Sequence, residues 1–192
     1  MNLAPRRFRL ASVVLSGAIA LLTARPAQPM SPPPPPNIWY VKYHQQGLQI
    51  GTSWTTAFSF FHDALGNSNL AAGDEIWVAQ DTYVPQNINT GFVIRVPVKI
   101  YGAFLGNETS VATRGGLASA TILEGLAPSG HQALHVVQIS NLTGTPGVLL
   151  DSFQIQDGSA AASRGGGIYC VSSDLDLTKC IFKSNIAENE GG

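Results

Sequence analysis

The chain has 192 residues, which is enough for one domain of ordinary size, and 44% of them are hydrophobic. Only 12% are Asp, Glu, Lys or Arg, about half the share that globular domains usually carry. This balance favours turn-rich β structure over a helical bundle, whose exposed faces normally carry Glu and Lys. The formal net charge is −1 and no basic patch follows residue 25, so the sequence does not predict nucleic-acid binding.

Residues 1–27 have the pattern of a secretory signal peptide. Three arginines precede the apolar stretch Leu10–Thr23, and small residues at Ala24 and Ala27 follow it. That stretch is shorter than the roughly 20 residues of a comfortable membrane span. We expect general secretory export, with a twin-arginine signal and an uncleaved anchor helix as the alternatives. The mature chain then has no membrane span, and the protein is secreted or lies at the cell surface.

A proline-rich linker, residues 28–37, follows the signal. It contains five consecutive prolines, Pro32–Pro36, which favour an extended polyproline II spacer. The next region, residues 38–72, begins with a β-prone run at Ile38–Val41.

A short amphipathic helix is predicted over residues 54–65. Its apolar residues recur at steps of three and four, at Trp54, Ala57, Phe58, Phe61, Ala64 and Leu65. Ser53 or Thr55 is suited to the N-cap, and Gly66-Asn67 to the stop.

Short strands separated by turns are predicted from Gly73 to the end of the chain. The apolar runs are short, and the segments between them are rich in Gly, Asn, Ser and Pro. We expect strands at residues 76–79, 92–94, 98–101, 121–123, 134–139, 148–150, 153–155, 168–171, 175–177 and 180–182.

An internal repeat with a constant 27-residue offset is the sharpest feature of this region. It aligns Leu150 with Leu177, Ile155 with Phe182, Gly158 with Asn185 and Ala160 with Ala187. Gly and Asn adopt left-handed turns most readily, so the Gly158–Asn185 match indicates such a turn in both copies. A unit of this length is typical of one coil of a β-solenoid, in which neighbouring coils share a core and Phe182 points inward.

The predicted fold is therefore an all-β right-handed parallel β-helix (solenoid) with a short N-terminal capping helix. Residues 73–192 form its coils, and the helix at 54–65 covers the open end of the first coil. A helix packed elsewhere on the coils is the alternative. Gly191-Gly192 fall at the start of a further coil in the repeat register, so we expect the sequence to be truncated at the C-terminus.

Several segments resemble bacterial right-handed β-helix repeat proteins with a pectin-lyase-like fold. The first group is Gly51-Thr52-Ser53-Trp54, Gly73-Asp74-Glu75-Ile76-Trp77-Val78-Ala79 and Ile100-Tyr101-Gly102-Ala103-Phe104-Leu105-Gly106, followed by Arg114. The second group, similar to the repeats of polymorphic outer-membrane proteins, is Gly165-Gly166-Gly167-Ile168-Tyr169 and Cys180-Ile181-Phe182-Lys183-Ser184-Asn185. Ala103 departs from the family, which usually has a second Gly there. The resemblance implies the fold, but its members include both polysaccharide-cleaving enzymes and adhesins.

A lyase acting on acidic sugars would need a base and a group of cations. The candidate acids are Asp151, Asp157, Asp174 and Asp176, and the candidate bases are Lys179, Lys183 and Arg164. Asp174 and Asp176 alternate along one strand-like run, so they are either a metal pair or part of a solvated outer face. We assign no catalytic, cofactor-binding or metal residue from this set.

The remaining polar motifs give no site. His44 and His62 lie in the entry region, and His131 and His135 lack a third zinc ligand nearby. Cys170 and Cys180 either form a disulfide or are small core residues. Asn107 and Asn141 begin glycosylation triplets, which matter only in a eukaryotic secretory route.

The leading hypothesis for function is a non-enzymatic adhesion or binding scaffold, whose partners are polysaccharides or other cell-surface components. The alternative is the N-terminal part of a polysaccharide lyase or hydrolase acting on acidic glycans. A gene fragment without a present role is the third possibility. No cofactor is expected.

Overall fold

The computed structural model describes residues 34–144, 146–161 and 163–189. The predicted signal peptide and most of the predicted linker lie outside the described residues. From Pro35 onward the chain forms one compact unit. Short strands dominate it: β1 Ile38–Val41, β2 Glu75–Ala79, β3 Asp81–Tyr83, β4 Phe92–Ile94, β5 Lys99–Phe104, β6 Thr121–Glu124, β7 Val137–Ser140, β8 Val148–Asp151, β9 Gln154–Gln156, β10 Ser159–Ala160, β11 Ile168–Val171, β12 Leu175–Thr178, β13 Ile181–Lys183 and β14 Ile186–Ala187.

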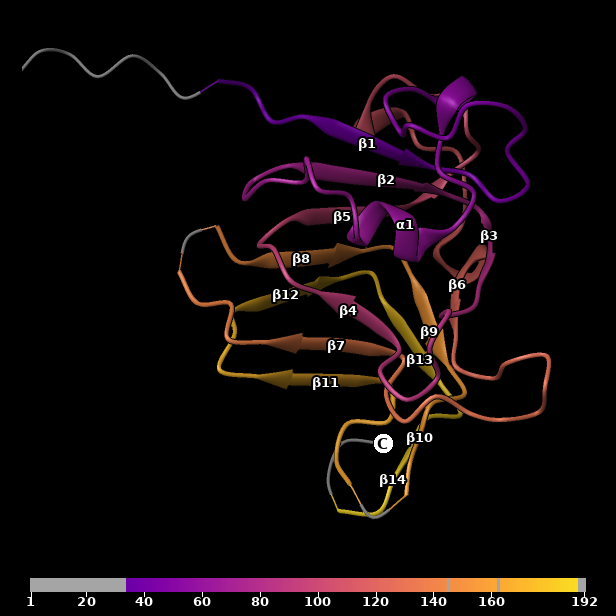
Figure 1. Cartoon of the computed structure of the whole chain (residues 1–192), viewed down its shortest axis with the longest axis vertical. Coiled ribbons are helices and arrows are strands. Elements are labelled where there is room, and N and C mark those ends of the chain that lie inside the picture. Colours follow the sequence, from indigo (N-terminus) through magenta and orange to yellow (C-terminus); the bar gives the residue numbers. More distant parts are fainter. Residues whose placement is uncertain (1–33, 145, 162, 190–192) are drawn as a thin grey trace, which may run out of the picture. The chain divides into compact units, whose positions relative to one another are not determined.

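These strands form four parallel sheets. A five-stranded sheet has the order β1-β2-β5-β8-β12, a four-stranded sheet β13-β9-β6-β3, a three-stranded sheet β11-β7-β4 and a two-stranded sheet β10-β14. From β2 onward the chain passes through the five-stranded, the four-stranded and the three-stranded sheet repeatedly in this order. Each pass adds a strand next to the strand that the previous pass contributed to the same sheet (Figure 1). The prediction of a β-rich fold with little helix is confirmed.

The predicted 27-residue offset is confirmed in the register between strands β8, β9 and β10 and their partners β12, β13 and β14. Leu177 pairs with Leu150, Phe182 with Ile155 and Ala187 with Ala160. Earlier strand pairs have other offsets, as in the pairing of Ile100 with Leu150, because long loops separate their strands. The repeat is therefore regular only near the C-terminal end of the described chain.

Side chains that point between the sheets form the core. Alternation along each strand places every second residue there, so Val148 and Leu150 of β8 and Ile155 of β9 are fully buried. The same face of the neighbouring strands contributes Ile76, Val78, Ile94, Ile100, Leu123 and Ile139. Burying each such side chain contributes roughly 1.5–3 kcal/mol to folding.

The prediction of one helix over residues 54–65 is wrong. The segment contains a 3₁₀ turn, Trp54–Thr56, and a separate helix α1, Phe61–Leu65. Between them Phe58 pairs with β1, donating its backbone N–H to Tyr40 and accepting from the N–H of Lys42. Strand pairing with β1 therefore overrides the helical period of the sequence. The helix ends at Gly66 as predicted.

Helix α1 covers apolar side chains next to β1 and β4, which are edge strands of their sheets (Figure 1). Phe61 is 1% exposed, and its ring lies 5.1 Å from that of Phe92. Trp54, predicted to share this role, instead packs on the rings of Tyr40 and Phe104 and donates its indole N–H to Glu108 O at 2.7 Å.

The predicted left-handed turn lies one residue earlier than the alignment indicates. Asp157 and Ser184 adopt positive φ angles of 59° and 53°, whereas Gly158 and Asn185 do not. Gly158 is required for a different reason, because a Cβ there would overlap the carbonyl oxygen of Gly166. The Asn185 side chain donates to Ile155 O at 2.8 Å and accepts from Gly158 N at 3.0 Å, which ties the two repeats together. Ala103 takes a φ of 62°, a conformation that glycine favours.

Three further expectations have outcomes in the structure. Phe182, predicted to point inward, lies beside the buried Ile155 as that position requires, but the burial expected of it is wrong, because its side chain is 46% exposed. Cys170 and Cys180 are free thiols, of which Cys180 packs partly buried against the core and Cys170 is exposed. No helix within the described residues has the length and apolar character needed to cross a membrane.

Candidate functional site

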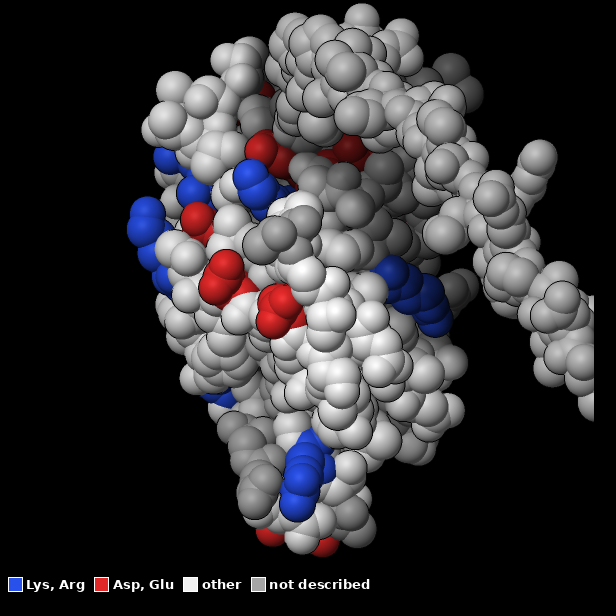
Figure 2. Space-filling model, turned by 90° about the vertical axis from the view of Figure 1, so that its left-hand side faces the viewer, with Lys and Arg blue, Asp and Glu red and all other residues white. Residues whose placement is uncertain are grey.

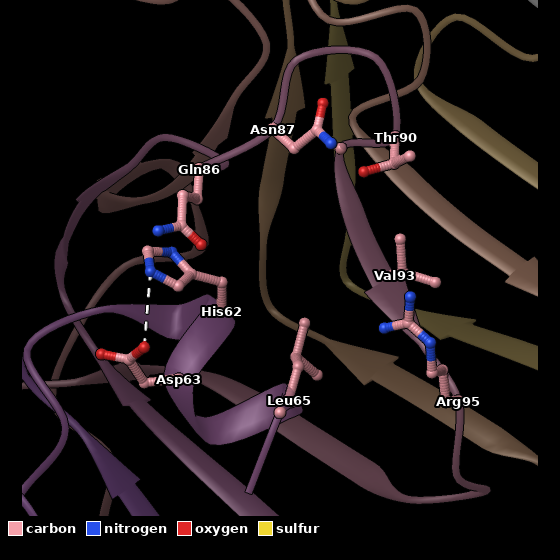
Figure 3. A pocket seen from close by; sticks show the side chains of 10 residues that line it. His62, Asp63, Leu65, Gln86, Asn87, Thr90, Val93 and Arg95 are labelled. Atoms are coloured by element: carbon pink, nitrogen blue, oxygen red, sulfur yellow. Dashed lines mark ion pairs between the residues drawn. The ribbon is translucent and has the colours of Figure 1, made fainter.

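A polar groove of about 440 Å³ lies between helix α1 and strand β4. We call it the α1 groove. Figure 3 shows His62 of α1 next to Gln86 of the facing loop, and Arg95 across the groove from both. Its polar lining consists of His62, Asp63, Gln86, Asn87, Thr90 and Arg95. Leu65 and Val93 supply its apolar floor.

The loop at residues 86–91 is held in place by a glycine turn. The backbone N–H groups of Thr90 and Gly91 donate to Asn87 O at 3.2 and 2.8 Å. Gly91 has a φ of 64°, and a Cβ there would overlap the carbonyl oxygen of His135. Only glycine therefore allows the loop to approach the chain before β7 so closely. This contact fixes Gln86, Asn87 and Thr90 opposite the helix.

His62 joins the groove to an exposed aromatic surface. Its ring stacks on Phe60 with centroids 5.2 Å apart and an interplanar angle of 15°, and Phe60 is 45% exposed. The Nε2 atom lies 3.4 Å from Asp63 Oδ1. The Nδ1 atom is shielded from solvent and has no hydrogen-bond partner among the described residues, a condition that native structures seldom leave without a reason.

Charge in the groove is mixed and low. Among the described residues that line it, Asp63 is the one acidic side chain and Arg95 the one arginine. No ion pair joins Arg95 to another residue in the part of the chain that the structure describes. Figure 2 shows the same scattered distribution of acidic and basic side chains among uncharged residues on one face of the unit. The groove thus offers several hydrogen-bond donors and acceptors without a strong field of either sign.

A second pocket, of about 650 Å³, lies beside the loop that follows β5. We call it the Arg114 pocket. Arg114, Ser152 and Lys179 line it together with Ser110 and small apolar residues. Ser152 and Lys179 occupy equivalent positions of successive repeats, and both adopt positive φ angles. The repeat therefore brings two polar side chains of successive units into one pocket.

Arg114 anchors this loop to the sheet. Its Nη1 atom lies 3.1 Å from Asp151 Oδ1 and also donates to Gly102 O, and its Nε donates to Val111 O. The guanidinium lies 5.4 Å from the centre of the Tyr101 ring. Ser152 Oγ donates to the same Asp151 oxygen at 2.5 Å. Burial raises the pKa of Tyr101, and the acidic side chains of Glu75 and Asp151 raise it further, while Arg114 opposes them.

The structure places two of the predicted acid and base candidates near the Arg114 pocket and leaves the others apart. Lys179 lines the pocket, and Asp151 is bonded to Arg114 and Ser152, which also line it. Asp174 precedes β12 and accepts from Gly144 N at 2.8 Å, whereas Asp176 is exposed on β12. Asp157 lies in a turn, and Lys183 and Arg164 are exposed elsewhere.

The histidines do not converge on a metal. His131 is exposed beside Ser129, and His135 is buried, with its Nδ1 atom 2.9 Å from Gly165 O and its ring stacked on Tyr169. His44 is also exposed. Within the described residues, no group of three or more His, Cys, Asp or Glu side chains is arranged to hold a metal ion.

Sequence reasoning missed most of the α1 groove. In the sequence His62 is a lone histidine, and Gln86, Asn87, Thr90 and Arg95 belong to no recognised motif. Arg114 stands out there only through a family resemblance. Of the residues that line the Arg114 pocket, Lys179 was already a candidate base, and the 27-residue offset makes Ser152 its equivalent in the preceding repeat.

Comparison of the chain with protein-family models, with curated proteins and with solved structures finds no match.

Proposed function

We propose that the chain is the body of a secreted or cell-surface protein built as a right-handed parallel β-helix of the pectin-lyase-like kind, with α1 as its capping helix. The β-helix is supported by the chain passing repeatedly through three parallel sheets in one order, and by the 27-residue offset between paired strands. The secretory pattern of residues 1–27 supports export.

The proposed function is non-enzymatic binding of an uncharged glycan in the α1 groove, as part of adhesion at a surface. The observation that carries this proposal is the combination of a polar groove with the exposed ring of Phe60, which stacks on the groove residue His62. Sugar hydroxyls need donors and acceptors together, and the apolar C–H face of a sugar ring packs against an aromatic ring. Gln86, Asn87 and Thr90 supply the first requirement, and Phe60 supplies the second.

The low charge of the groove favours a neutral glycan over a polyanion. One arginine beside one aspartate gives no excess of positive charge with which to bind a chain of carboxylates. A neutral ligand also predicts that binding changes little between low and moderate salt, because no charged contacts are screened.

Titration calorimetry of the exported chain with neutral and uronate oligosaccharides tests the proposal. We expect binding of a neutral oligosaccharide that weakens by about tenfold or more in Gln86→Ala and Thr90→Ala variants, which each remove hydrogen-bonding groups. Lys183→Ala, an exposed change on β13 away from the groove lining, is the matched control. Equal affinity in the groove variants and the wild type would refute the assignment.

A second candidate function, cleavage of acidic glycans, is favoured by one observation. Arg114 and Lys179 line one pocket and Asp151 is bonded to Arg114, and a cation beside a carboxylate is what abstraction of a proton next to a uronate requires. However, Asp151 Oδ1 is already occupied by Arg114 and Ser152. Rising ultraviolet absorbance from unsaturated uronate products, abolished by Lys179→Ala, would establish this function in place of the first.

A further inference from the structure

A third pocket, of about 270 Å³, lies at the loop that joins β1 to the 3₁₀ turn Trp54–Thr56. We call it the glutamine pocket. Three glutamines line it together with a serine and two aromatic rings: Gln45, Gln46, Gln49, Ser59, Tyr43 and Phe60. No Asp, Glu, Lys or Arg is among the described residues that line it. The pocket therefore offers amide and hydroxyl groups without a fixed charge.

Phe60 joins the glutamine pocket to the α1 groove. Its side chain is 45% exposed and lines the glutamine pocket. Its ring also stacks on that of His62, which lines the α1 groove, with the ring centroids 5.2 Å apart. Tyr43 lies 6.1 Å from Phe60, and His44 lies 3.9 Å from Tyr43, again between ring centroids. A continuous series of ring contacts thus leads from one polar cavity to the other.

The loop that carries the glutamines is fixed to the residue before Phe60. Ser59 is 5% exposed, its Oγ donates to Gln45 O at 3.0 Å, and its backbone N–H donates to Gln49 Oε1 at 3.1 Å. Gln45 Nε2 donates to Thr55 O at 2.9 Å, which ties the loop to the 3₁₀ turn as well. These bonds hold the pocket in place beside Phe60, so binding there requires little ordering of the loop.

The glutamine side chains keep hydrogen-bonding capacity for a ligand. Within the described residues, no donor reaches Oε1 of Gln45 or Oε1 of Gln46. The Gln46 side chain is exposed, and in the part of the chain that the structure describes its Nε2 atom contacts only His44 O, at 3.5 Å. An amide presents both donors and an acceptor. The two side chains therefore suit sugar hydroxyls, which donate and accept as well.

The two cavities have the same chemical character. The α1 groove combines the amides of Gln86 and Asn87 with one acidic and one basic side chain, Asp63 and Arg95. The glutamine pocket has amides and no such charges. A polymer of repeating neutral units can satisfy both cavities, whereas an acidic polymer finds no excess of positive charge in either.

We propose that the glutamine pocket is a second subsite for the glycan, and that the ligand is an extended neutral oligosaccharide with separate units in the α1 groove and in the glutamine pocket. The chain between these units packs on the exposed part of the Phe60 ring, as an apolar sugar face does on an aromatic side chain. The inference rests on the proposed function, glycan binding in the α1 groove. It adds that a chain of several sugar units binds more tightly than a disaccharide.

Titration calorimetry with cello-oligosaccharides and manno-oligosaccharides of increasing length tests the second subsite. We expect the affinity to rise by about tenfold or more from the disaccharide to the hexasaccharide, because only the longer chain reaches both cavities. Gln46→Ala should weaken binding of the hexasaccharide by about fivefold and leave that of the disaccharide unchanged. Gln86→Ala in the α1 groove should weaken binding of both. Gln132→Ala is the matched control, because Gln132 is exposed and lines neither cavity.

Backbone amide chemical shifts give a second measurement that needs no variant. Those of Gln46 and Ser59 should move with the hexasaccharide and stay constant with the disaccharide, whereas that of Gln86 should move with both. Equal affinities for the two lengths, with no effect of Gln46→Ala, would overturn the second subsite and leave binding in the α1 groove intact. Shifts at Gln86 that respond to no member of either series would overturn both the second subsite and the function on which it rests.

Discussion

Phe182 lies beside Ile155 on the neighbouring strand, and the two residues occupy the same position in successive repeats. Their environments nevertheless differ, because Ile155 is fully buried whereas Phe182 is 46% exposed. The two residues have equivalent positions in the repeat, but β13 pairs with the strand of Ile155, whereas no described strand pairs with the outer side of β13. Comparing substitutions at Ile155 and Phe182 therefore shows how much burial contributes to stability at one position of the repeat.

Introducing Asp at the two positions should give unequal losses of stability. Ile155→Asp places an unpaired carboxylate in the core and should prevent folding or cost more than about 4 kcal/mol. Phe182→Asp leaves the carboxylate in contact with water and should cost about 1 kcal/mol. Urea unfolding followed by circular dichroism measures both, and equal losses would show that Phe182 is buried in solution.

Arg114 should be essential for the loop that follows β5. Arg114→Ala leaves the largely buried Asp151 without its cation, which typically costs about 3–5 kcal/mol. Arg114→Lys keeps the charge but loses the planar group that also bonds Gly102 O and Val111 O, so it should recover only part of the loss. The measurement is the free energy of unfolding of the wild type, Arg114→Ala and Arg114→Lys proteins. A stable Arg114→Ala variant would mean that the loop does not depend on this contact.

Gly91 should matter more than other glycines with a similar backbone conformation. Gly130 has a φ of 81° and open space where a Cβ would lie, so Gly130→Ala should cost only the backbone strain of about 1 kcal/mol. Gly91→Ala adds an overlap with His135 O and should cost about 2 kcal/mol more. It should also weaken glycan binding in the α1 groove, because the loop at 86–91 must move. Scanning calorimetry measures the stability of both variants. Equal losses of stability in Gly91→Ala and Gly130→Ala would contradict the close approach of Gly91 to His135 O.

Asp74 should make stability depend on acid pH. Burial alone would raise the pKa of Asp74, but hydrogen bonds from Trp39, Ala71 and Asn37 outweigh it and lower the pKa below its ordinary value. A carboxyl with a lowered folded-state pKa stabilises the protein above its unfolded-state pKa, near 4. That stabilisation is lost as the pH falls below about 4 and through the folded-state pKa.

The Asp74→Asn variant isolates this contribution. It should be about 1–3 kcal/mol less stable than the wild type at pH 7, since an amide cannot accept all of these hydrogen bonds. Its stability should change less between pH 4 and pH 2. Urea unfolding across this range tests the prediction, and parallel curves for the two proteins would exclude Asp74 as the source.

The sequence was informative where structure depends on local pattern. Apolar runs such as Ile76–Ala79 became strands, and the alignment of Leu150 with Leu177 gave the register. The short strands β3, β10 and β14 were missed because they are only two or three residues long and depend on pairing with neighbours. The continuous helix over residues 54–65 failed for a similar reason, because Phe58 pairs with β1.

The α1 groove was harder to predict because its residues meet only in the folded chain. His62 and Arg95 lie far apart in the sequence, and no motif links them. Their meeting depends on the tight loop at Gly91 and on the separate folding of α1. Neither feature has a sequence signature stronger than a single glycine or a short apolar run.

The most direct test of the proposed function is a map of backbone amide chemical shifts during titration with a neutral oligosaccharide. We predict that the shifts of Gln86, Asn87 and Gly91 move with increasing ligand, while those of Ser152 and Lys179 stay constant. Shifts that move at the Arg114 pocket instead, or that move nowhere in the described chain across a panel of neutral glycans, would contradict binding in the α1 groove.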